Sequence, residues 1–118
     1  MTRLYKLIDR IAWTAAVAAG RFNGAGADLE DGYIHFSTAA QAAETARRYF
    51  NGRPDLLLLT LETETLPPAL TAALRWEPAR GGDLFPHLYA PLDPTLVIET
   101  RALTLGDDGA PIVGSLEP

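Results

Sequence analysis

The chain has 118 residues, of which 47% are hydrophobic, and it contains no cysteine. This length suits one compact domain with a single core, and the lack of cysteine excludes disulfides and thiolate chemistry. A formal net charge of −5 argues against nucleic acid as the main partner, because affinity for a phosphate backbone comes mainly from clustered cations. No apolar run is long enough for a membrane span, and no signal-peptide pattern begins the chain, so we expect a cytoplasmic protein.

The first 32 residues predict a strand, a helix and a loop. Residues 3–8 suit a short strand, and Asp9 can cap a helix over residues 10–19. Residues 20–32 are rich in Gly, Asn and Asp and predict an exposed loop. Trp13 is a single bulky side chain on an Ala-rich helix, so it either anchors the core or lines a ligand pocket.

The eight residues 31–38 carry the strongest signal in the chain. An Asp-Gly turn begins them, and the alternation that follows predicts a short strand with one apolar and one polar face. The polar face holds Tyr33, His35 and Ser37, three hydrogen-bonding groups where a core-facing strand would show none. These side chains are therefore candidates for contact with a ligand, whereas the alternative for His35 is a purely structural bond to a backbone carbonyl.

A helix is predicted to begin directly after this strand. Thr38 is its expected N-cap, since Gln41 completes a capping box and an apolar stripe follows over residues 39–50. The first N–H groups of a helix attract anions. We therefore expect His35, Ser37 and Thr38 to lie beside an anion-binding helix start, with further contacts needed for useful affinity.

The rest of the chain predicts more strands than helices. The expected elements are a central strand buried on both faces at residues 56–61, a short helical segment at 68–73, extended segments at 76–78 and 84–89, and a long strand at 95–105. This last strand can form a hairpin through residues 106–109, and the last five residues should fray. Helices mixed with antiparallel strands indicate an α+β domain.

A second candidate site surrounds His87, which lies between Phe85 and Tyr89 after a glycine-containing loop. The alternative is that the aromatic side chains fill the core while His87 points to water. The spacing of the two histidines and the aspartates matches no metal-ligand pattern, so no metal is assigned. Nucleophile-elbow, dinucleotide-fingerprint and phosphate-loop motifs are also missing from the sequence.

Several motifs together resemble one family of small bacterial proteins. They lie at residues 4–6, 13 with 20, 31–39, 46 with 49–50, 76–77 and 84–89. The family is the one catalogued as domain of unknown function 952, and the resemblance runs from about residue 3 to about residue 101. With the length of the chain, this gives a single domain over residues 1–118, in which residues 102–118 are a C-terminal hairpin or tail. The family name carries no activity.

More distantly, a strand ending in His-x-Ser, followed by a helix and an apolar strand, is similar to the ADP-ribosyltransferase superfamily, particularly the RNA 2′-phosphotransferases that use NAD. This resemblance implies a curved or split, mostly antiparallel sheet with two main helices and a dinucleotide cleft. On this analogy His35 and Ser37 meet the dinucleotide, Tyr33 lies beside them and His87 lies across the cleft.

The chain also departs from that superfamily. Residues 5–6 are Tyr-Lys where many of those enzymes have His or Arg followed by Gly, and Glu77 and Glu99 are the only candidates for a late-strand catalytic glutamate. The arginines are scattered, which argues against an RNA phosphate as substrate.

The leading hypothesis is a cleft that binds a nucleotide or another small anionic ligand of the NAD or ADP-ribose type. If the protein is an enzyme, the reaction class implied is ADP-ribosyl transfer from NAD or hydrolysis of NAD. The candidate catalytic residues are His35 and His87, and the candidate ligand-binding residues are Tyr33, Ser37, Thr38, Trp13 and Tyr89. The alternative hypothesis is a non-catalytic protein-interaction module in which both histidines are structural.

Overall fold

The computed structural model describes residues 2–118, which form two antiparallel three-stranded sheets and four helices. The strands are β1 (Arg3–Asp9), β2 (Ile34–His35), β3 (Leu56–Glu62), β4 (Leu74–Pro78), β5 (Leu84–Leu88) and β6 (Glu99–Ala102). The helices are α1 (Arg10–Ala19), α2 (Ala27–Asp31), α3 (Ala39–Tyr49) and α4 (Pro68–Ala73), and single 3₁₀ turns cover Thr63–Thr65, Arg80–Gly82 and Pro94–Leu96. The expected α+β domain with a split antiparallel sheet is confirmed at this level.

The first sheet has the order β1-β3-β6, so the apolar run of β3 lies at its centre as predicted. Leu57 and Leu59 belong to a core cluster shared with α1, whereas Leu58 faces a second cluster beneath α3. Successive side chains of a strand point to opposite faces, so a strand covered on both faces must be apolar throughout. This explains the unbroken leucine run.

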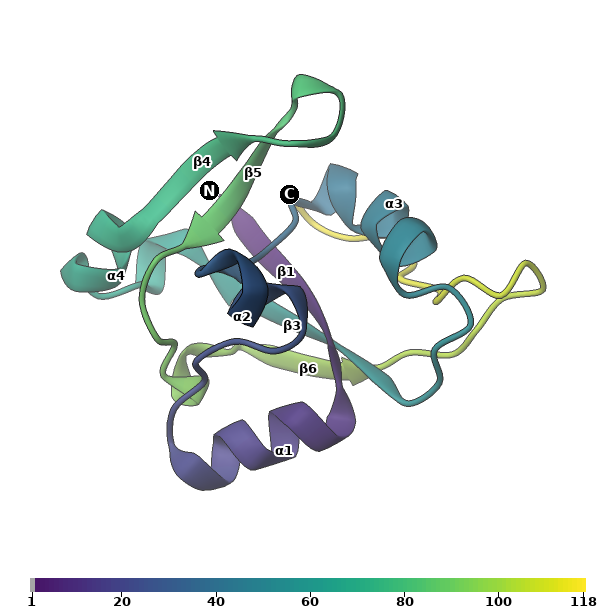
Figure 1. Ribbon diagram of the computed structural model, residues 1–118, viewed down its shortest axis with the longest axis horizontal. Helices are drawn as coiled ribbons and strands as arrows, with labels where there is room; N and C mark the ends of the chain where they lie inside the picture. The colour runs from purple at the N-terminus through teal and green to yellow at the C-terminus, as the bar shows by residue number, and fades with distance from the viewer. Residues whose placement is uncertain (1) are drawn as a thin grey trace.

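The second sheet has the order β2-β5-β4, and its register places His35 directly opposite His87. Beyond β2 the chain leaves this sheet and pairs with the first one: the Tyr5 N–H donates to the Ser37 carbonyl and the Ser37 N–H to the Tyr5 carbonyl, each at 2.8 Å. The hairpin of β4 and β5 lies at one edge of the molecule, and α3 with the C-terminal segment lies at the opposite edge (Figure 1). The residues around Ser37 therefore connect two diverging sheets.

Two sequence predictions in the loops are wrong. Residues 20–32 are not entirely loop, because they include α2, a single five-residue helix that ends at Gly32 in the left-handed region (φ 85°). The long strand predicted over residues 95–105 is replaced by a 3₁₀ turn, followed by the short strand β6. The Asp93 carboxylate accepts a bond from the Thr95 N–H at 2.9 Å and caps that turn, which apolar alternation alone does not reveal.

The C-terminal segment is more ordered in its contacts than predicted. Leu105 and Pro111 form an antiparallel bridge around the expected turn. The prediction that the last five residues fray is wrong for Glu117, whose carbonyl accepts a bond from the Tyr5 hydroxyl at 2.6 Å. Val113, just before these residues, is buried in the cluster beneath α3. The segment therefore completes the core on that face of the first sheet.

Candidate functional site

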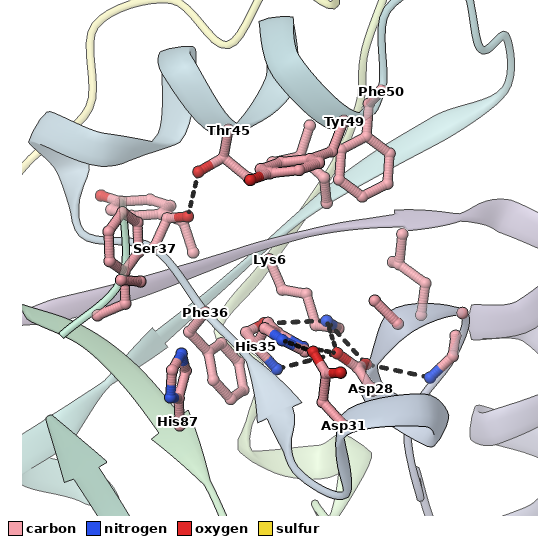
Figure 2. A pocket seen from close by; sticks show the side chains of 18 of the residues that line it. Lys6, Asp28, Asp31, His35, Phe36, Ser37, Thr45, Tyr49, Phe50 and His87 are labelled. Atoms are coloured by element: carbon pink, nitrogen blue, oxygen red, sulfur yellow. Dashed lines mark hydrogen bonds and ion pairs between the residues drawn. The ribbon is translucent and has the colours of Figure 1, made fainter. Parts of the chain in front are cut away.

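A cavity of about 540 Å³ lies between the two sheets, α2 and α3. This volume falls within the range of small-molecule sites. Four of the candidate residues from the sequence line it, namely Tyr33, His35, Ser37 and His87. Figure 2 shows that Thr45 and Tyr49 come from α3 on one side, while His87 comes from β5 on the other. The structure thus gathers residues from both sheets, from α2 and α3, and from the loop between β4 and β5 around one space.

A network of charged groups forms one wall of this cavity, with Asp28 at its centre (Figure 2). Asp28 is buried, and its carboxylate lies 2.9 Å from the Lys6 ammonium. It also accepts bonds from the backbone N–H groups of Ala25 and His35, each at 3.0 Å, and from His35 Nδ1 at 2.7 Å. Lys6 donates further to the His35 carbonyl at 2.9 Å, so the network fixes β1, α2 and β2 against one another.

The surroundings of this buried pair change the pKa of both partners. Burial alone would raise the pKa of Asp28, but the bond from the His35 ring, the Lys6 charge and the two backbone donors together lower it to about 2. Burial lowers the pKa of the Lys6 ammonium, and the attraction of Asp28 offsets part of that change. Asp28 therefore remains a carboxylate at any ordinary pH and keeps its negative charge, paired with Lys6, in the cavity wall.

His35 is held by carboxylates on both sides of its ring. Nδ1 lies 2.7 Å from Asp28, and Nε2 lies 2.9 Å from Asp31, which is about half exposed. A carboxylate only accepts hydrogen bonds, so both contacts are satisfied together only when the imidazole carries both protons. A ligand can bond to His35 Nε2 only after Asp31 moves away.

His87 has a different arrangement, with one ring nitrogen oriented and the other available. Its Nδ1 lies 2.8 Å from the Glu77 carboxylate, which also accepts the Tyr89 hydroxyl at 2.6 Å. The hydrogen bonds from Tyr89 and His87 lower the pKa of Glu77, so Glu77 stays ionised and accepts the Nδ1 proton. No partner for His87 Nε2 is found in the part of the chain that the structure describes. In the neutral ring this nitrogen carries the lone pair, as a general base requires.

Tyr33 packs beside both histidines, whose own ring centroids are 5.4 Å apart, and the three rings form one aromatic cluster. The Tyr33 ring centroid is 4.6 Å from that of His35, 4.1 Å from that of His87 and 5.0 Å from that of Tyr89. Burial, followed by the charges of nearby carboxylates, raises the pKa of the Tyr33 hydroxyl. Tyr33 therefore presents a neutral hydroxyl and a stacking surface beside both histidines.

Ser37 is bonded across the cavity to α3, and this bond decides what its hydroxyl can do. Thr45 Oγ1 donates to the Gln41 carbonyl at 3.1 Å, and its oxygen lies 2.9 Å from Ser37 Oγ and 3.1 Å from Arg80 Nη2. A hydroxyl has one hydrogen, so Thr45 accepts from both Ser37 and Arg80. The Ser37 hydroxyl can therefore only accept a further bond.

The remaining candidates lie outside the cavity lining. Thr38 forms the predicted capping box with Gln41 at the start of α3, whereas the cavity is lined by the far end of that helix. Trp13 lies in the core, edge-on to Phe22 with 5.7 Å between ring centroids, because α1 packs this face against the first sheet. Tyr89 reaches the site only through Tyr33 and Glu77.

Sequence reasoning missed three residues that shape the site, namely Lys6, Asp28 and Arg80. Lys6 is the only lysine of the chain and lies among the apolar residues in the middle of β1, a signal that could have marked it as a buried ion-pair partner. Asp28 carries no comparable signal, because it lies in a segment whose composition resembles a loop. Of the two candidate glutamates, Glu77 lies beside His87, whereas Glu99 is exposed on β6.

The family of the chain can now be stated. Residues 7–100 match the family described as Protein of unknown function (DUF952). The chain belongs to this family. The predicted DUF952 resemblance is confirmed, and no match is found among the curated proteins.

Solved structures agree with this family assignment. The crystal structure of protein CC0527 from Caulobacter crescentus is 45% identical over 95% of each chain, with a TM-score of 0.87. The solution structure of the same protein is 47% identical over 94% of this chain and 92% of that chain, with a TM-score of 0.81. Both are structural-genomics targets whose descriptions state no activity.

Two further findings concern residues 2–118 of this DUF952 chain. None of the helices there is long and apolar enough to cross a membrane. Within the same residues no group of three or more histidine and acidic side chains is arranged to hold a metal ion.

Proposed function

We propose that the cavity binds a nucleotide-type anionic ligand such as NAD or ADP-ribose, in a cleft of the kind found in ADP-ribosyltransferases. The observation that carries this proposal is the convergence of His35, His87 and Tyr33 on one cavity, with His87 oriented by Glu77. Polar aromatic rings that face a cavity can stack on a base or a ribose.

In this proposal the two histidines have different roles. His87 acts as the acid/base residue, because Glu77 holds Nδ1 and leaves Nε2 to exchange a proton with the ligand. His35 orients a ribose hydroxyl, which takes the place of Asp31 at Nε2. Asp31 can move at little cost because its side chain is about half exposed.

If the protein turns its ligand over, the reaction that fits is hydrolysis of NAD or transfer of its ADP-ribose. In hydrolysis, a water oxygen forms a bond to the ribose carbon that carries nicotinamide. The carbon–nitrogen bond breaks, and its electron pair stays on nicotinamide. His87 Nε2 accepts the proton that water loses, so one NAD and one water give ADP-ribose, nicotinamide and a proton.

Calorimetric and thermal-shift titrations with NAD, ADP-ribose and AMP test the proposal. A ligand that binds only the folded state raises its stability by about 2.7 kcal/mol at a hundredfold excess over its dissociation constant. We expect such a shift in the unmodified protein and in Ile11→Ala, a control whose side chain is 81% exposed on α1. We expect His35→Ala to bind these ligands more weakly. If NAD is turned over, the rate of nicotinamide release should fall by about 10²–10⁴-fold in His87→Ala.

The same titrations decide against the proposal if none of the three ligands stabilises the unmodified protein. The protein-interaction module then replaces it as the leading hypothesis. Capture of a partner at fixed stoichiometry, unchanged by His35→Ala and His87→Ala, would support that alternative.

A further inference from the structure

We propose that Arg80 is the anion-binding residue of this cavity and that it takes the phosphate group of the ligand. This inference rests on the proposed function and assigns a binding residue to the charged group of the ligand. Arg80 lies on the cavity lining, in the loop that joins β4 and β5.

The loop and α3 together hold the Arg80 side chain in place. Gly81 and Gly82 both have positive φ (65° and 85°), which lets the loop turn back so that the Ala79 N–H reaches the Asp83 carbonyl at 2.9 Å. The guanidinium carbon lies 4.7 Å from the Phe85 ring centroid. This side chain is therefore ordered before any ligand arrives, which reduces the entropy lost on binding.

Two residues of α3 complete the support of the guanidinium. Thr45 accepts a bond from Nη2 at 3.1 Å, and the Tyr49 ring centroid lies 5.6 Å from the guanidinium carbon. Thr45 and Tyr49 are four positions apart and share one face of the helix. An arginine side chain has five N–H donors, so the bond to Thr45 leaves four for an oxyanion.

The charges around the cavity place the anion at the end where Arg80 lies. Lys6 is paired with Asp28, and Arg53 is paired with Asp9 at 2.5 Å. Of the lysine and arginine side chains that line the cavity within residues 2–118, Arg80 alone has no carboxylate partner.

The opposite end of the cavity offers no unpaired cation to an anion. There the Lys6 ammonium is bonded to Asp28, and the His35 ring is bonded to Asp28 and Asp31. A ligand that places a ribose near the histidines and a base against the aromatic rings therefore directs its phosphate toward Arg80. A guanidinium can bind two phosphate oxygens at once through parallel N–H donors.

The test pairs two ligands that differ only in the phosphate, AMP and adenosine, titrated calorimetrically into three proteins. These are the unmodified chain, Arg80→Gln and the control Arg48→Gln, which removes an exposed arginine of α3 that is paired with Glu44. We expect Arg80→Gln to weaken the binding of AMP by about 10- to 100-fold and to leave the binding of adenosine unchanged. Arg80→Lys should be intermediate, because it keeps the charge and loses the paired donors.

The outcomes separate this inference from the proposed function. Suppose that AMP binds the unmodified chain. If Arg80→Gln then binds AMP equally well, or if its affinities for AMP and adenosine fall by the same factor, the assignment of Arg80 is wrong while the ligand cleft stands. If neither AMP nor adenosine binds the unmodified chain, the assignment of Arg80 falls together with the proposed function. A loss of AMP in Arg48→Gln as large as in Arg80→Gln would mean that net charge alone is responsible, which also refutes the assignment.

Discussion

The buried pair of Lys6 and Asp28 gives the sharpest stability prediction. Asp28→Asn keeps the shape of the side chain, but it leaves the Lys6 charge buried without a carboxylate partner. Removing one partner of a buried ion pair costs about 3–5 kcal/mol, a large part of the stability of a small domain. Urea unfolding followed by circular dichroism measures this loss.

The pKa of Asp28 gives a second value for the stability that its ionised form contributes. In the folded protein it is about 2, below its ordinary value of 3.8. At about 1.4 kcal/mol per pKa unit, this difference corresponds to roughly 2–3 kcal/mol of stability. Because the folded value is the lower one, the contribution is fully present above pH 4 and is lost as the pH falls through about 2. We therefore expect the stability of the unmodified protein to fall between pH 4 and pH 2, and that of Asp28→Asn to fall less.

A matched control and a double variant decide whether the reasoning holds. Asp55→Asn makes the same change in the pair with Arg10, where both side chains are about half exposed, and it should cost less than about 1 kcal/mol. Lys6→Met combined with Asp28→Asn removes both charges and should recover part of the loss of Asp28→Asn. The reasoning is refuted if Asp28→Asn costs no more than Asp55→Asn, or if the effects of Lys6→Met and Asp28→Asn simply add.

Three further predictions test other parts of the structure. The hydrogen bond to Glu77, followed by burial, raises the pKa of Tyr89, so Glu77→Gln should let this tyrosine ionise at lower pH in an ultraviolet titration; an unchanged curve would contradict the bond. Trp13→Ala should cost about 3–5 kcal/mol of stability in urea unfolding because the side chain is buried against Phe22. Its ligand affinity, measured by calorimetry, should not change, and weaker binding would mean that Trp13 contributes to the ligand site. Thr38→Ala should lower the stability by about 1 kcal/mol through loss of the helix cap, and no change in the thermal midpoint would show that the capping box contributes nothing.

Features that depend on neighbouring residues could be predicted from the sequence. Thr38 and Gln41 lie three positions apart, so the capping box that starts α3 is written locally. The leucine run at residues 56–61 predicts a central strand because only burial on both faces makes such a run favourable. The motifs around His35 and His87, together with four shorter ones, identified the family.

The pairing of residues across the hairpin was only partly accessible. Once β4 and β5 are placed in register, Glu77 lies opposite Phe85 and Arg75 opposite His87, so Glu77 and His87 become diagonal neighbours on one face. The sequence predicted the extended segments but not the register, because the intervening loop admits more than one turn. This is why Glu77 was a candidate without a partner.

What only the tertiary structure decided is the contact between segments that are distant in the chain. Lys6 and Asp28 are 22 positions apart, and nothing near either residue indicates the other. Trp13 has the size for either a core or a pocket, and the packing of α1 against the first sheet places it in the core. Arg80 became a feature of the cavity because its loop turns toward α3. Local patterns determine where helices and strands begin, whereas the charge and the lining of a cavity follow from which elements pack together.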